Sequence, residues 1–221
     1  MIRMIAIGMA GLVAACAGGD QRMASEAAPA PNMSHVHMGH VLTGWQDTPD
    51  QMGLLPTAQA EAEVAAQHAG FAASRPNDLD WMKLHAGHVL HAVDPSVESD
   101  GPGLGYGVQR AAQSVAQHVR FAADSEDASD NVKLHATHVE TSAGNVVAWS
   151  QRIVELGQQV QAASSAGEAA PLVVEIETLT QAILAGTDAN GDGTVSWQES
   201  EGGLAQAAQH MQFMQEGEGM A

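Results

Sequence analysis

The chain repeats one pattern of apolar and polar positions fifty residues apart. AQHAGFAASRPNDLDWMKLHAGHV (residues 66–89) aligns without a gap with AQHVRFAADSEDASDNVKLHATHV (residues 116–139), and roughly half of the positions are identical. Each copy has an alanine-rich run, a polar break and a second run that begins close to an aspartate, which favours the first turn of a helix. The pattern therefore predicts two helices in each copy.

Two helical hairpins of this kind are the parts of a four-helix bundle, and an internal repeat implies that both hairpins have the same architecture. The expected helices cover residues 57–74, residues from Asp80, residues 107–124, and residues from Asp130 toward Ala162. We therefore expect an all-α fold. Its bundle should occupy residues 35–165 and contain the two repeats, at about 57–93 and 107–143.

Histidines occur at equivalent places in both copies. His68 lies about nine residues before the middle of its turn and His85 about eight residues after it, so at about 1.5 Å per residue both stand at the same height on facing helices. His85 and His88 are three residues apart and share a helix face. The first hairpin should thus bring three imidazoles together. The second should group their counterparts, His118, His135 and His138.

Three imidazoles that converge inside a bundle are a candidate transition-metal site. Zinc and copper accept imidazole nitrogen, and the Irving–Williams order favours copper. The alternative is that the histidines were copied with the hairpin and hold no metal. The spacing and composition over about residues 57–140 are similar to those of small histidine-rich metal-binding proteins of the bacterial periplasm, and this resemblance also implies metal binding.

A further group of histidines lies in MSHVHMGHVL, residues 33–42. This segment is either a half-repeat packed on the bundle or a flexible arm that collects metal. Its thioether and imidazole groups suit copper. We therefore treat His35, His37 and His40 as candidate accessory ligands.

A b-type haem held by histidines on opposite helices is a second candidate cofactor, as in four-helix cytochromes. Phe71 and Phe121, each three residues after the first histidine of its copy, would line the haem pocket. Aromatic residues make up only 4% of the chain, however, so few large side chains are present to line a haem-sized cavity. The repeat lacks the Glu-x-x-His pairs of di-iron proteins. No set of nucleophile, base and orienting residue is visible, so the sequence does not predict an enzyme.

Near the C-terminus, DANGDGTVSWQE resembles the twelve-residue calcium loop of EF-hand proteins. The resemblance implies an EF-hand module over residues 170–215, with a helix on each side of the loop. It also implies the Ca²⁺ ligands Asp188, Asn190, Asp192, Thr194, Ser196 and Glu199. EF-hands normally work in pairs, so this loop should either pair with a second copy in a homodimer or hold the last helices in place as a structural site.

The N-terminal residues indicate export. Arg3 precedes an apolar run, MIAIGMAGLVAA, that is too short to span a bilayer and is typical of a secretory signal. The run ends at VAAC, which resembles the lipobox of bacterial lipoproteins. The resemblance implies that residues 1–15 are removed, that Cys16 carries a lipid, and that residues 16–34 form a tether. Ala17 after the cysteine, rather than aspartate, implies the outer membrane, facing the periplasm.

Charge and cysteine content narrow the function further. A formal net charge of −18 argues against nucleic acid as a partner and suits cation binding. A single cysteine excludes an intramolecular disulfide, a cysteine-rich zinc site and covalently attached haem. The sequence therefore predicts a lipid-anchored extracytoplasmic protein that binds calcium and copper or zinc, and that buffers the transition metal or delivers it to a partner protein. The alternatives are an electron-transfer protein with haem or copper, and a calcium-stabilised structural lipoprotein.

Overall fold

The computed structural model describes residues 31–220. Over this range the chain forms seven α-helices and one short 3-10 helix, with no strand, so the all-α prediction is confirmed for this part of the chain. The helices are α1 (Met33–Leu42), η1 (Pro49–Gln51), α2 (Leu54–Ala73), α3 (Leu79–Val93), α4 (Val108–Asp124), α5 (Asp130–Ala162), α6 (Ala166–Ala185) and α7 (Leu204–Gly217).

Polar residues determine where several helices begin. The side chains of Asn32, Asp78, Ser129 and Ser165 each accept a hydrogen bond from a backbone N–H in the first turn of the following helix. Such caps satisfy N–H groups that have no partner inside the helix. The polar breaks of the two repeats end at Asp78 and Ser129. For this reason α2 to α5 lie within a few residues of their expected positions.

Helix α5 is 33 residues long and continues without interruption through Gly144 and Asn145. The side chain of Asn145 does not compete with the helix backbone, because its partners lie in the loop between α6 and α7. It donates hydrogen bonds to the carbonyl oxygens of Gln198 and Gly202 and accepts one from the N–H of Ser200. Asn145 thus holds this loop against α5.

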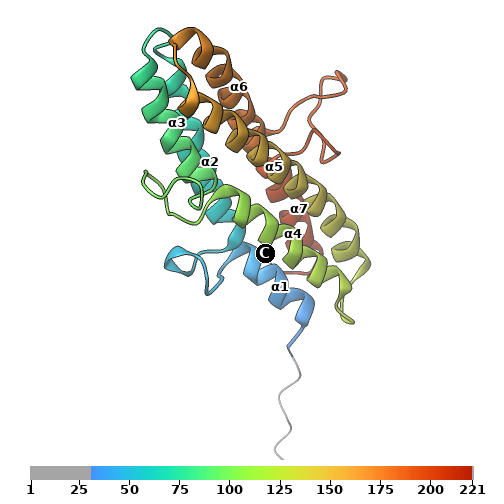
Figure 1. Cartoon of the computed structure of the whole chain (residues 1–221). Helices are drawn as coiled ribbons and strands as arrows, with labels where there is room; N and C mark the ends of the chain where they lie inside the picture. Colours follow the sequence, from blue (N-terminus) through green and yellow to red (C-terminus); the bar gives the residue numbers. More distant parts are fainter. Residues whose placement is uncertain (1–30, 221) are drawn as a thin grey trace, which may run out of the picture. The chain divides into compact units, whose positions relative to one another are not determined.

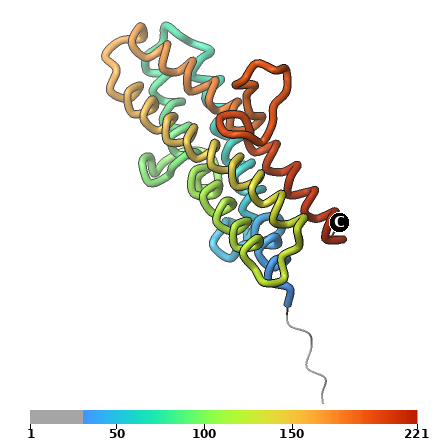
Figure 2. The backbone as a smooth tube through the Cα atoms, turned by 90° about the vertical axis from the view of Figure 1, so that its right-hand side faces the viewer, coloured from blue at the N-terminus to red at the C-terminus, as the bar shows by residue number. Residues whose placement is uncertain are grey.

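The helices pack in pairs along α5. Helix α2 packs against α3, and α4 packs against α5; α1 lies on α4, α6 lies on α2 and α5, and α7 lies on α5 (Figure 1). The view turned by 90° shows the red α7 next to the yellow α5 as well (Figure 2). Helices α6 and α7, expected in a C-terminal calcium module, therefore contact the helices of the repeat directly.

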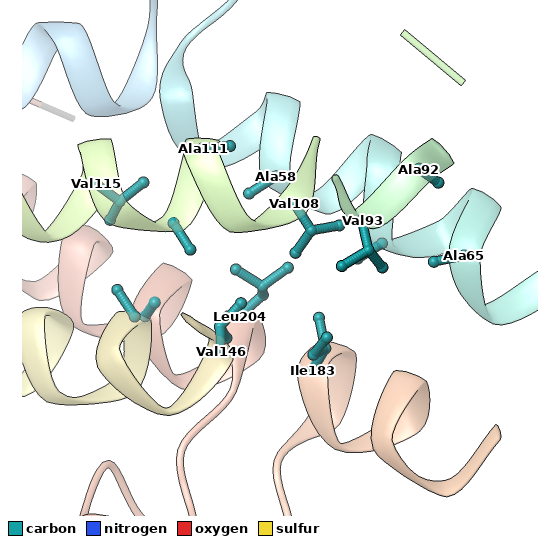
Figure 3. Close-up of a cluster of buried hydrophobic side chains, with 14 of the residues drawn as sticks. Ala58, Ala65, Ala92, Val93, Val108, Ala111, Val115, Val146, Ile183 and Leu204 are labelled. Atoms are coloured by element: carbon teal, nitrogen blue, oxygen red, sulfur yellow. The ribbon is translucent and has the colours of Figure 1, made fainter. Parts of the chain in front are cut away.

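Small apolar residues fill the core between these helices. Alanines and valines of α2 to α5 meet Ile183 of α6 and Leu204 of α7 (Figure 3). Helices approach closely where contact residues are small. At Gly157 of α5, an added Cβ would lie 2.6 Å from the Cδ2 atom of Leu90 in α3. This close packing fixes which face each helix turns to its neighbours, and so fixes the direction of the histidines.

Candidate metal centres

Nine of the eleven histidines gather in three triads on the described part of the chain. In every triad one helix supplies a His-x-x-His pair and a second helix supplies a single histidine. Site 1 is formed by His37, His40 and His118, site 2 by His68, His85 and His88, and site 3 by His135, His138 and His210. Within each site, one nitrogen atom from each ring lies within 4.8 Å of the other two.

The single histidine is the centre of its triad, and every close contact joins Nδ1 atoms. The Nδ1 atom of His118 lies 3.2 and 3.4 Å from those of its two partners in site 1. For His68 in site 2 the distances are 2.8 and 3.2 Å. For His210 in site 3 they are 3.0 and 3.4 Å. Three imidazole nitrogens bound to one ion at about 2.0–2.1 Å with tetrahedral angles are about 3.3–3.4 Å apart. The longest contact in sites 1 and 3, 3.4 Å, matches that spacing, and the other contacts are shorter, so a small separation of the rings would admit one ion.

In the absence of an ion, the same contacts are unfavourable as hydrogen bonds between imidazoles. A neutral imidazole has a proton on one nitrogen and a lone pair on the other. Without a metal, the central Nδ1 must share either its one lone pair or its one proton between both outer rings, depending on the tautomer. A metal ion instead uses one lone pair from each of the three rings. The arrangement is therefore better suited to metal ligation than to hydrogen bonding.

Burial keeps the central histidines neutral. It is the main cause that lowers the pKa of His68, His118 and His210 to about 4, and the neighbouring imidazoles of each triad lower it further. Burial also lowers the pKa of several outer ligands, namely His40, His85, His135 and His138. A metal binds the neutral imidazole. The central nitrogen of each site is thus available to a metal at neutral pH and well below it.

Aromatic residues are concentrated at these sites. The chain has three phenylalanines and four tryptophans, and each triad contacts one phenylalanine and one tryptophan. The phenylalanine lies three residues after the central histidine in each case: Phe121 in site 1, Phe71 in site 2 and Phe213 in site 3. The tryptophans are Trp45, Trp81 and Trp197, respectively.

The tryptophans come from three unrelated places in the chain. Trp45 follows α1, and its ring centroid lies 4.7 Å from those of both His40 and His118. Trp81 is in the first turn of α3 and reaches only one histidine of site 2, at 4.3 Å. Trp197 lies in the loop before α7 and stacks on a histidine of site 3 at 3.9 Å. A tryptophan at each triad is therefore not a simple result of duplication.

The structure brings together only one of the two expected histidine groups. His68, His85 and His88 meet across the first hairpin as predicted. The predicted group of His118 with His135 and His138 is wrong. Spacing along a hairpin fixes the height of a residue but not the face that it occupies. In the second hairpin, His118 contacts α1, whereas the pair on α5 contacts α7.

Three further histidines are members of the triads. Two of them were expected only as accessory ligands, and the third was not predicted. His37 and His40, expected as accessory ligands, are two full members of site 1. His210 was missed, although AQHMQF (residues 208–213) is a third copy of the AQHxxF pattern and would have revealed it.

Two histidines lie outside the triads. The Nε2 atom of His35, another candidate accessory ligand, lies 2.9 Å from the carboxylate of Glu218. The Nδ1 atom of His91 lies 2.9 Å from the carbonyl oxygen of Glu98.

The expected calcium loop is held by backbone hydrogen bonds to its first acidic residue. The carboxylate of Asp188 accepts hydrogen bonds from the N–H groups of Gly191, Asp192 and Gly193, and the last of these glycines has φ 88°. However, the following helix, α7, begins only at Leu204, so Glu199 does not lie in its first turn.

A different carboxylate is buried near the loop. Glu201 is 2% exposed and accepts hydrogen bonds from the N–H and the hydroxyl of Ser196. Ser196 is one of the expected ligands, and its hydroxyl is therefore already engaged. Calcium binding by this loop stays a prediction.

Other expectations lie outside what the structure describes. Residues 1–15 and Cys16 are beyond the described range, as are most of residues 16–34. Among the described helices, none is long and apolar enough to cross a membrane.

Comparison of the chain with protein-family models, with curated proteins and with solved structures finds no match. The function must therefore be inferred from the chemistry of the three histidine sites.

Proposed function

We propose that the protein binds transition-metal ions at sites 1, 2 and 3, one ion per site, and that it buffers the metal or delivers it to a partner protein. The observation that carries the proposal is the convergence of three Nδ1 atoms, repeated in three places with the same central-histidine arrangement. Copper and zinc are the metals that fit imidazole ligands. Three equivalent sites on one chain suit holding several ions better than catalysis at one centre.

The histidine geometry favours a bare ion over haem. Two imidazoles that ligate one haem iron approach it from opposite faces of the ring, so the haem separates them. In site 2 the Nδ1 atoms of His68 and His85 face each other at 2.8 Å, which leaves no room for a porphyrin between the rings. Phe71, considered as a haem contact, lies with its ring centroid 5.4 Å from that of His68.

The cellular setting belongs to the same proposal. The VAAC sequence at Val13–Cys16 supports a lipid anchor, and Ala17 supports the outer membrane, facing the periplasm. The net charge of −18 would attract cations from the surrounding solution. Calcium at the loop is a separate part of the proposal, supported by its ligand spacing and by the backbone hydrogen bonds to Asp188.

Metal content measured by elemental analysis tests the transition-metal part. Purified protein, loaded with copper or zinc and freed of excess metal, should retain three ions per chain. His88→Ala, His40→Ala and His138→Ala each remove one outer ligand and should each lower the content by one ion. His91→Gln is the matched control, because His91 lies outside the triads, and it should retain all three ions. If the three ligand variants retain as much metal as the unchanged protein, the proposal is wrong.

A further inference from the structure

We propose that the ion for which the three sites are built is monovalent copper, Cu(I), held by three imidazoles inside a wall of aromatic rings. This inference rests on the proposed function and specifies its metal and oxidation state. It is drawn from three features of the described residues: the charge of the ligand set, the number of ligands, and the identity of the side chains around them.

The ligand set carries no negative charge. Each triad contains three imidazoles, and no cysteine, aspartate or glutamate joins any of the three groups in the described part of the chain. Between residues 31 and 220, the nine imidazoles also make no hydrogen bond or ion pair to a carboxylate; the histidine–carboxylate contact found there is that of His35 with Glu218, outside the triads. A bound ion would therefore keep its full charge within the site.

An uncompensated charge favours the monovalent ion. The Born cost of moving an ion from water into a low-dielectric site grows with the square of its charge, so a divalent ion costs about four times as much as a monovalent one. Partly buried sites usually offset that cost with carboxylates or thiolates, or with carboxylates that accept a hydrogen bond from the outer imidazole nitrogen. In site 2 the outer nitrogen of His85 is instead buried without a hydrogen-bond partner. The site thus lacks the compensation that a zinc or Cu(II) ion needs.

The ligand number favours the same ion. Structural zinc is almost always four-coordinate. Each triad supplies three histidines and no fourth metal-ligating side chain of the cysteine, aspartate or glutamate type in the described residues. Cu(I), in contrast, is stable with three ligands and tolerates a planar arrangement of them. The Nδ1 separations of 3.4 Å between His40 and His118 and between His138 and His210 are compatible with such a three-coordinate ion.

Aromatic rings contact the imidazoles of every site, which is the third feature. In site 1 the indole of Trp45 contacts two of the three imidazoles, and the ring centroid of Phe121 lies 5.3 Å from that of the third, His37. The π face of an indole attracts a nearby cation and offers no lone pair to compete as a ligand. The aromatic rings therefore add attraction for a bound cation without adding a fourth ligand atom, which suits a three-coordinate ion.

Paired titrations without oxygen test the inference. The protein is titrated with Cu(I) against bicinchoninate, a coloured Cu(I) chelator, and separately with Zn²⁺ against a coloured zinc chelator. We expect three Cu(I) ions per chain, and a preference for Cu(I) over Zn²⁺ of at least about 100-fold in affinity. X-ray absorption of the copper form should show three nitrogen ligands per ion. Binding of Zn²⁺ as tightly as Cu(I) would overturn the Cu(I) assignment and leave the proposed function standing. Absence of binding by both metals would overturn both.

Tryptophan variants test the aromatic wall itself. Trp45→Leu should weaken Cu(I) binding at site 1 by about tenfold, or about 1.4 kcal/mol, as expected for loss of a cation–π contact. Trp149→Leu is the control, since Trp149 contacts none of the nine imidazoles through its ring in the described structure. Equal Cu(I) affinity in the two variants, both checked by circular dichroism for unchanged helix content, would show that the wall does not contribute.

Discussion

The Nδ1 atoms of His135 and His210 lie 3.0 Å apart, although 75 residues separate them in the chain. The first belongs to α5 and the second to α7, the last helix of the described chain. A metal ion bound by both would join the C-terminal helix to the centre of the molecule. Site 1 joins α1 to α4 in the same way, through His37 and His118.

Metal binding should therefore stabilise the terminal helices most. A ligand that binds only the folded state at about 1,000 times its dissociation constant adds about 4 kcal/mol for each site. At about 2–4 °C per kcal/mol for a chain of this size, three filled sites should raise the melting temperature by more than about 20 °C. Hydrogen exchange should slow in α1 and α7 on loading. In His210→Ala, loading should no longer protect α7, whereas α1 should respond as before; protection of α7 in that variant would contradict the role of site 3.

The stability of the metal-free protein should fall as the pH drops from about 6.5 to about 4. In the folded state the pKa of His68, His118 and His210 is lowered to about 4, chiefly by burial. In the unfolded chain these imidazoles take up protons near pH 6.5. The unfolded state thus binds more protons in this window, and lower pH favours unfolding. At about pH 8 all three are neutral in both states, and the effect vanishes.

Urea midpoints measured between pH 8 and pH 4 give the slope of this dependence. A variant with glutamine at the three central positions (H68Q, H118Q, H210Q) removes the groups with the lowest pKa. Its stability should change less over the same window. A steeper loss of stability in that variant than in the unchanged protein would mean that other groups cause the effect. Metal-loaded protein should resist acid better, because protons must then displace the ion.

Two glycines of α5 provide a matched test of the close helix packing. A Cβ at Gly157 would lie 2.6 Å from the Cδ2 atom of Leu90, whereas a Cβ at Gly144 would meet nothing within 4 Å. Gly157→Ala should destabilise the protein by about 1–3 kcal/mol through overpacking. Gly144→Ala should stabilise it by about 0.5–1 kcal/mol, because alanine favours the helix interior. Denaturant unfolding of both variants measures the difference; equal effects would show that α3 and α5 are not in contact at this point.

The sequence predicted helix positions well because their signals are local. Asp78 and Ser129 cap α3 and α5 at the ends of the polar breaks, and a repeat makes each signal visible twice. The grouping of the histidines was predicted only for site 2, whose members all lie within one hairpin. Sites 1 and 3 depend on long-range packing of α1 on α4 and of α7 on α5, which hairpin spacing does not determine. The AQHxxF pattern does recur at His210, so the ligand itself was visible in the sequence, although its partners were not.

The loop between α6 and α7 offers a test that is independent of the histidines. Asp188 accepts three backbone N–H hydrogen bonds, and Glu201, 2% exposed, accepts two from Ser196. We expect calcium to bind at Asp188 and its neighbours, so Asp188→Ala should abolish calcium binding measured by calorimetry and leave the copper content unchanged. Glu201→Ala should instead cost about 1 kcal/mol of stability with or without calcium, because it leaves the two donors of the partly buried Ser196 without their acceptor. If Glu201→Ala removes calcium while Asp188→Ala does not, the ion is held by the buried carboxylate and not by the ligand set that the loop spacing predicts.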